Sequence, residues 1–253
     1  MRRLGFIRIR LLLLGASAAV ILVSAAYPYL SFRGDLSKKY HTQGQNALWM
    51  AHHWVGEEHT PQEYLDLALH LKQHDITDAF FHVGPLNPDG TIDQARYPYA
   101  AQLIHNVKRY FPELRIQAWV GQVERKGGGP LDLSDEQVRA NIVSTAAGLL
   151  DLGFDGIHYN IEPVYSGDDH FIDLLRSTKQ MAGASDNVLS VASDELEPCW
   201  GAERVVRIFA NQAGFWNRAY YLEVAAHVDQ MAVMMYDTAL PADWLFGTLV
   251  QWE

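Results

Sequence analysis

The sequence contains a single cysteine, Cys199, among its 253 residues. An intramolecular disulfide is therefore impossible, and the fold must be stabilised by packing. Basic residues are also scarce after the first segment. Residues 1–34 hold five arginines and no acidic residue, which leaves 15 basic and 30 acidic residues in the remainder. A protein surface with this excess of negative charge argues against nucleic acid as a partner, so we expect none.

Motifs for cofactors and metals are missing as well. No glycine-rich phosphate loop follows the first expected strand, residues 46–54. Adjacent His52 and His53 would lie on opposite faces of a strand, and the H-x-H and cysteine clusters typical of metal sites are absent. The run Gly127–Gly129 is followed by Pro130, which indicates a flexible loop. We expect no cofactor and no bound metal.

The N-terminus has a long uncharged run from Leu11 to Leu30, preceded by arginines. Such a run is long enough to cross a bilayer. Basic residues before it, with no comparable cluster after it, place the N-terminus in the cytoplasm and the following residues outside. Small residues between Val23 and Ala26 would also permit signal-peptide cleavage. We expect residues 1–34 to be a signal anchor or signal peptide, and residues 35–253 to be membrane-anchored outside the cytoplasm or secreted.

From residue 45 onward, strand-like apolar runs alternate with amphipathic helical patterns, which is typical of parallel βα units. Two capping boxes, Thr60–Glu63 and Ser134–Gln137, mark the starts of the first and third helices. The expected strands are 46–54, 78–83, 115–123, 155–163, 188–193 and 230–237. The expected helices are 60–71, 98–111, 134–149, 168–181 and a longer helical stretch around 204–227.

Six βα units are visible, with a sixth helix beginning at Pro241, whereas a β/α barrel needs eight. We predict an α/β fold of the TIM (β/α)8-barrel type over residues 35–253, with about six units present and the C-terminal units missing. Without further units, an open arc of six strands would leave the backbone hydrogen-bonding groups of its two edge strands unpaired. The alternative is an open doubly wound sheet.

The fourth expected strand, Asp155–Pro163, carries a polar face. With a period of two, His158, Asn160 and Glu162 share one face, and the other face is apolar. A strand buried on both sides is normally apolar on both, so the polar face indicates a site. The active site of a β/α barrel lies at the C-terminal strand ends, where Glu162 would sit. The other strand ends add carboxylates and aromatic rings, a mixture that suits a sugar: Trp54, Trp119, Asp194, Tyr236 and Asp237.

The segment Phe154–Glu162 resembles the fourth-strand signature of glycoside hydrolase family 18, D-G-x-D-x-D-x-E, in which the final Glu is the general acid. The segment Met234–Asp237 resembles the sixth-strand M-x-Y-D motif of that family. His158 and Asn160 stand where family 18 has its second and third Asp. The Asn-x-Glu ending instead resembles the family 85 endo-β-N-acetylglucosaminidases. The likeness spans about residues 45 to 240.

This resemblance implies hydrolysis of β-linked N-acetylglucosamine glycans, with the substrate's own acetamide oxygen as nucleophile. Glu162 would protonate the leaving oxygen and later act as base on water. Asn160 would orient the acetamide nitrogen, Tyr236 would donate to the acetamide oxygen, and Asp237 would hold the sugar. The expected substrate-binding residues are His158, Trp54, Trp119 and Asp194.

Asn160 changes the electrostatics of the expected acid. A carboxylate at this position would raise the pKa of Glu162, so burial must do so instead. A protonated His158 would lower that pKa, and we expect His158 to be neutral and hydrogen-bonded. Two alternatives remain open: a glycan-binding barrel without catalysis, and a two-carboxylate glycosidase with Glu162 as acid and its nucleophile on a later strand.

Overall fold

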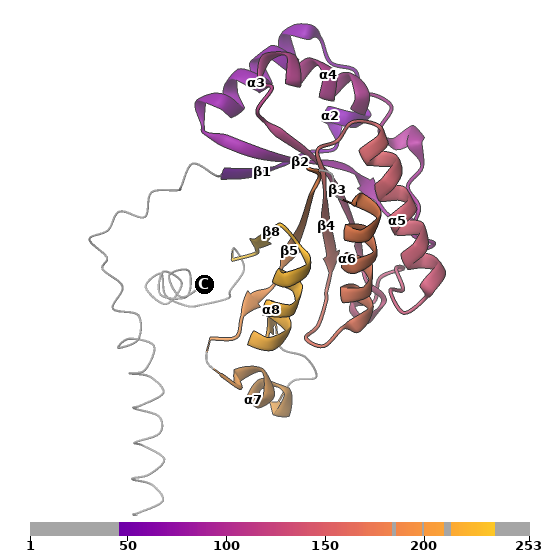
Figure 1. Cartoon of the computed structure of the whole chain (residues 1–253), viewed down its shortest axis with the longest axis vertical. Coiled ribbons are helices and arrows are strands. Elements are labelled where there is room, and N and C mark those ends of the chain that lie inside the picture. Colours follow the sequence, from indigo (N-terminus) through magenta and orange to yellow (C-terminus); the bar gives the residue numbers. More distant parts are fainter. Residues whose placement is uncertain (1–45, 184–185, 199, 210–213, 236–253) are drawn as a thin grey trace, which may run out of the picture. The chain divides into compact units, whose positions relative to one another are not determined.

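The computed structural model describes residues 46–183, 186–198, 200–209 and 214–235 (Figure 1). Its strands are β1 (Asn46–Met50), β2 (Ile76–Pro85), β3 (Arg115–Val123), β4 (Gly156–Glu162), β5 (Val188–Ser193), β6 (Glu195–Leu196), β7 (Phe215–Trp216) and β8 (Gln230–Val233). Its α-helices are α2 (His53–Gly56), α3 (Pro61–Gln73), α4 (Ala100–Tyr110), α5 (Glu136–Asp151), α6 (Asp169–Ala182), α7 (Ala202–Phe209) and α8 (Arg218–His227). The expected N-terminal anchor and the helix from Pro241 lie outside these ranges. Within them, no helix combines the length and apolar character needed to cross a bilayer.

Six strands form one parallel sheet in the order β1-β2-β3-β4-β5-β8. This order follows the sequence and never reverses, whereas a doubly wound sheet reverses at a switch point. The sheet curls, and the connecting helices α3 to α6 and α8 lie along its outer side (Figure 1). The fold is therefore a curled parallel half-barrel, a partial TIM barrel as predicted, and the doubly wound alternative is wrong.

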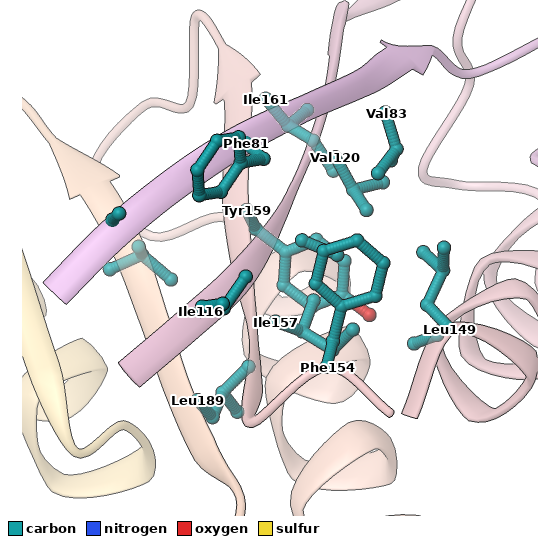
Figure 2. Close-up of a cluster of buried hydrophobic side chains, with 14 of the residues drawn as sticks. Phe81, Val83, Ile116, Val120, Leu149, Phe154, Ile157, Tyr159, Ile161 and Leu189 are labelled. Carbon is teal, nitrogen blue, oxygen red and sulfur yellow. The ribbon is translucent and has the colours of Figure 1, made fainter. Parts of the chain in front are cut away.

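The outward face of β4 belongs to the main hydrophobic core. Ile157, Tyr159 and Ile161 are buried there beside apolar residues of β2, β3 and β5, with Leu149 of α5 close by (Figure 2). Full burial of each such side chain contributes roughly 1.5–3 kcal/mol. The hydroxyl of Tyr159 is satisfied by Thr178 of α6 at 2.9 Å. The apolar face of β4 is thus fixed against helices, which turns its polar face to the inner surface of the arc.

Helix starts follow the sequence in one case and depart from it in another. The Thr60 capping box is confirmed, with Pro61 at the first helical position of α3. The capping box predicted at Ser134 is wrong, because Asp135 is the N-cap of α5. The Ser134 hydroxyl instead donates to Asp132 at 2.6 Å, so it is not available to the helix.

Two elements differ from the expected pattern. The first strand ends at Met50, and His53–Gly56 forms the short helix α2. The single long helix expected around 204–227 is wrong, since β7, which pairs with β6, lies between α7 and α8. The buried carboxylate of Glu197 explains the break. It accepts hydrogen bonds from backbone amides at the starts of both helices, including those of Glu203 and Arg218.

Candidate active site

The inner face of the arc is built from alternate residues of each strand. In the sheet register, His158 of β4 lies beside Trp119 of β3 and Ser190 of β5, and Asn160 lies beside Gly121. Glu162 follows at the C-terminal end of β4. Successive inward residues therefore form layers, and Glu162 belongs to the layer at the carboxyl ends of the strands.

His158 is fully buried and lies in the layer below the expected acid. Trp49 of β1 donates its indole N–H to Nε2 of His158 at 3.0 Å, so the proton of the ring must be on Nδ1. Nδ1 then donates to the Ser190 hydroxyl at 2.8 Å, and Phe80 stacks on the ring with centroids 3.9 Å apart. Burial lowers the pKa of His158 to about 3. The expectation of a neutral, hydrogen-bonded His158 is confirmed, and neither ring nitrogen is left for a substrate.

The hydrogen bonds continue from His158 across the whole inner face. The Ser190 hydroxyl donates to Oε1 of Gln117 at 2.7 Å. The amide of Gln117 donates to Asp78 at 2.9 Å and to Gln230 at 3.1 Å. The guanidinium group of Arg115 donates two hydrogen bonds to the carboxylate of Asp78, at 2.7 and 2.6 Å. This polar layer, made of Trp49, His158, Ser190, Gln117, Asp78 and Gln230, joins all six strands of the main sheet.

Above the polar layer, Glu162 and Asn160 share the inner face of β4, and both are partly buried. Burial raises the pKa of Glu162, while a hydrogen bond from the Asn160 side chain lowers it in part. The side-chain oxygen of Asn160 is buried and has no hydrogen-bond partner among the described residues. A buried acceptor without a donor costs free energy, so a site that brings a donor to it gains affinity.

Asp194 follows β5 directly and is partly buried. Burial, then the charges of Glu195 and Glu162, raise the pKa of Asp194 to about 7. The surroundings of the Asp194 carboxyl group therefore favour its protonated form.

Trp119 and His82 form an aromatic surface on the inner faces of β3 and β2. Their ring centroids are 4.6 Å apart, and both residues are partly exposed. Burial lowers the pKa of His82, and the charges of His52 and Arg96 lower it further. A neutral imidazole beside an indole gives an apolar, polarisable face of the kind that packs on a sugar ring.

Gly121 allows β3 to approach β4 closely at this point. A Cβ there would lie 2.6 Å from the carbonyl oxygen of Asn160 and 3.3 Å from the indole nitrogen of Trp119. The missing side chain therefore lets the aromatic surface and the Asn160 backbone lie side by side.

Gly121→Ala is expected to destabilise the protein by about 1–3 kcal/mol, because the backbone contact cannot relax without moving β3 or β4. Chemical denaturation measures this change. Gly148→Ala, in the exposed part of α5 where a Cβ meets nothing within 4 Å, is the matched control and should stabilise by about 0.5–1 kcal/mol. Equal stability of the Gly121 variant and the wild type would contradict the close approach.

The remaining predicted residues are placed differently. Trp54 lies in α2, where it stacks on His59 at 4.4 Å and packs against the hydrophobic core. The expected strand position of Trp54 is thus corrected, and its ring is occupied by protein contacts. Tyr236 and Asp237 lie outside the described residues. Among those that are described, no group of three His, Cys, Asp or Glu side chains is arranged to hold a metal ion.

Five residues of the polar layer were not predicted as site residues from the sequence: Trp49, Asp78, Gln117, Ser190 and Gln230. A signal for two of them was present, since Gln117 and Ser190 interrupt otherwise apolar strands in the same way as His158 does. Aligning the polar interruptions of neighbouring strands would have placed them at one height of the sheet.

Comparison of the fold with solved structures finds chitinases and related glycosylases. A chitinase from Chromobacterium violaceum has a TM-score of 0.52 at 15% identity, covering 77% of this chain and 57% of that one. The spore cortex-lytic enzyme SleL of Bacillus megaterium has 0.54 at 11%, covering 78% and 43%. A chitinase-like agglutinin from Robinia pseudoacacia has 0.52 at 16%, covering 77% and 55%.

At these identities the likeness establishes the fold. The chain spans about half the length of the solved structures it matches, for example 51% of a Group IV chitinase from Ostrinia furnacalis. No protein-family model and no curated protein sequence matches the chain.

Proposed function

We propose that this chain is a glycoside hydrolase that cleaves β-linked N-acetylglucosamine glycans by a substrate-assisted, retaining mechanism. One observation carries the proposal. At the C-terminal end of β4, where β/α barrels place their chemistry, Glu162 has a pKa raised by burial and lies beside the unpartnered side-chain oxygen of Asn160. Such a mechanism needs two groups from this strand: a general acid, and a hydrogen-bond acceptor for the N–H of the substrate's acetamide.

Glu162 would act first as general acid. Burial favours its protonated form, so it can give a proton to the glycosidic oxygen as the C1–O bond breaks. The acetamide oxygen of the substrate would attack C1 and form a cyclic intermediate. The ionised Glu162 would then take a proton from water as the water opens that ring, which restores the acid and retains the configuration.

Asn160 would orient the acetamide. Its unpartnered oxygen would accept a hydrogen bond from the acetamide N–H, which holds the acetamide oxygen toward C1. By the resemblance to family 18, Tyr236 would donate to the acetamide oxygen and Asp237 would hold the sugar. Trp119 with His82 would support the sugar ring, and the buried His158 would act as a support for the strand rather than as a substrate ligand.

Two other functions stay in competition. The fold likeness to a chitinase-like agglutinin gives some support to a glycan-binding barrel without catalysis. A two-carboxylate glycosidase would use Glu162 as acid and a second carboxylate as nucleophile. The proposal also includes the setting inferred from the sequence: residues 1–34 as signal anchor or signal peptide, and a glycosidase domain outside the cytoplasm.

The test is hydrolysis of a fluorogenic chitobioside by the full chain, with and without a thiazoline that mimics the cyclised acetamide. We expect turnover that the thiazoline inhibits competitively. Turnover without thiazoline inhibition would contradict substrate assistance and favour the two-carboxylate mechanism. Chitobioside binding with no turnover would favour the glycan-binding barrel.

A further inference from the structure

The backbone around Glu162 is held from two sides. The carbonyl oxygen of Glu162 accepts a hydrogen bond from the backbone N–H of Glu124, which follows β3, at 2.7 Å. Two residues after the acid, the carbonyl oxygen of Val164 accepts a hydrogen bond from the indole N–H of Trp216, in β7, at 2.6 Å. Val164 and Trp216 are both buried, so water cannot readily replace this second bond.

Trp216 is itself fixed by the structure around it. Its indole ring lies edge-on to Tyr220 of α8, with ring centroids 5.2 Å apart, and Phe171 of α6 lies beyond it at 6.5 Å. Its backbone carbonyl accepts a hydrogen bond from the N–H of Glu197 at 2.7 Å. The indole N–H is therefore presented to Val164 from a position that packing and the β6–β7 pairing both determine.

Two further hydrogen bonds connect the same parts of the chain. The backbone N–H of Asn217 donates to the Ser166 hydroxyl at 2.8 Å. The hydroxyl of Tyr220 donates to the backbone carbonyl of Asp168 at 3.2 Å. Together with the indole bond, they tie the loop between β4 and α6 to the segment where β7 leads into α8.

This loop needs such contacts, because residues 163–168 contain no strand or helix of their own. Sheet pairing supports Glu162 on one side alone: β3 pairs with β4 as far as Glu162, whereas the pairing with β5 ends at Tyr159. A general acid must lie within hydrogen-bond reach of the glycosidic oxygen, and a displacement of about 1 Å can cost about 100-fold in rate. Movement of the loop would therefore displace the acid.

We propose that Trp216 is a positioning residue for Glu162: its indole N–H fixes the carbonyl of Val164 and thereby keeps the acid at the end of β4 in reach of the glycosidic oxygen. In this role Trp216 contacts no reacting atom, and its effect passes through the backbone between Val164 and Glu162. The inference rests on the proposed function, and it gives β7 and the start of α8 a part in the chemistry.

Trp216→Phe tests this role, since phenylalanine keeps an aromatic ring in the same packing but has no N–H to donate. The kcat for chitobioside hydrolysis should fall by about 10-fold to 100-fold. KM should stay within about twofold, because the groups expected to bind the sugar are unchanged.

Val107→Ala is the control for the loss of packing alone. Val107 is buried in α4, which belongs to a different βα unit. Its replacement should lower the urea midpoint, as Trp216→Phe does, but leave kcat within about twofold of the wild type. An unchanged kcat in Trp216→Phe, or the same loss of kcat in Val107→Ala, overturns the positioning role.

Hydrogen–deuterium exchange of the full chain gives a second measurement that does not depend on turnover. In Trp216→Phe the amides of residues 164–168 should exchange about tenfold faster than in the wild type, as expected for the loss of one buried hydrogen bond. Val107→Ala should leave these amides unchanged, and unchanged exchange in Trp216→Phe overturns the inference. If the wild type hydrolyses no chitobioside, the proposed function fails, and the exchange rates still decide whether Trp216 holds the loop.

Discussion

Replacement of Glu162 by glutamine is expected to lower kcat for chitobioside hydrolysis by about 100-fold to 10,000-fold, the usual contribution of a positioned general acid. Glutamine keeps the size and the polar contacts of the side chain but has no acidic proton to give to the leaving oxygen. It also cannot take a proton from water in the second half of the reaction. Because Glu162 is only partly buried, the variant should fold with nearly the stability of the wild type.

Glu113→Gln is the matched control for this variant. Glu113 is exposed and precedes β3, so it lies at the opposite end of the strands from Glu162. Its replacement should leave kcat and KM within about twofold, as surface changes away from a site usually do. Measurement of both variants under the same conditions separates the loss of the acid from the loss of one negative charge. Equal turnover by Glu162→Gln and the wild type would remove Glu162 from the mechanism.

Ser190→Ala is expected to destabilise the fold by about 2–6 kcal/mol, since it leaves two buried groups without partners at about 1–3 kcal/mol each. The Nδ1–H of His158 loses its acceptor, and the amide oxygen of Gln117 loses its donor. Both groups are fully buried, so water cannot easily replace the hydroxyl. Urea denaturation of the two proteins measures the difference directly.

Ser193→Ala provides a control on the same strand. Ser193 is also buried, but its hydroxyl has no hydrogen-bond partner among the described residues. Removing that hydroxyl should be neutral or stabilising by up to about 1 kcal/mol, because an unsatisfied polar group is lost. Equal destabilisation of both serine variants would show that the hydrogen bonds of Ser190 in the polar layer do not account for its effect on stability.

The fold was predictable to the extent that it depends on local pattern. The strands at 115–123 and 188–193 have the expected bounds, because each is a compact apolar run between clear breaks. The sequential order of strands followed from the alternation with helices. Two of the errors result from side-chain hydrogen bonds. Asp132 accepts a hydrogen bond from the Ser134 hydroxyl, and Glu197 accepts hydrogen bonds from backbone amides at the starts of α7 and α8.

The candidate site was predictable on strand β4 and much less so elsewhere. Alternation along one strand placed His158, Asn160 and Glu162 on one face, and the structure keeps them there. The hydrogen bond from Trp49 to His158 could not be predicted in this way, because β1 and β4 are not neighbours in the sheet. Long-range contact of this kind depends on how far the strands twist and bend, which a single sequence does not encode locally.

The polar layer also constrains the order in which the protein can fold. Every pairing from β1 to β5 joins strands that are neighbours in the sequence, so the arc can grow by adding one unit at a time. The hydrogen bond between Trp49 and His158 is different, since 109 residues separate its two ends. Its loop-closure entropy is offset only after β4 is in place. Through this hydrogen bond of the polar layer, part of the stability of β1 depends on β4. Strands that are added one at a time thereby become one cooperative unit.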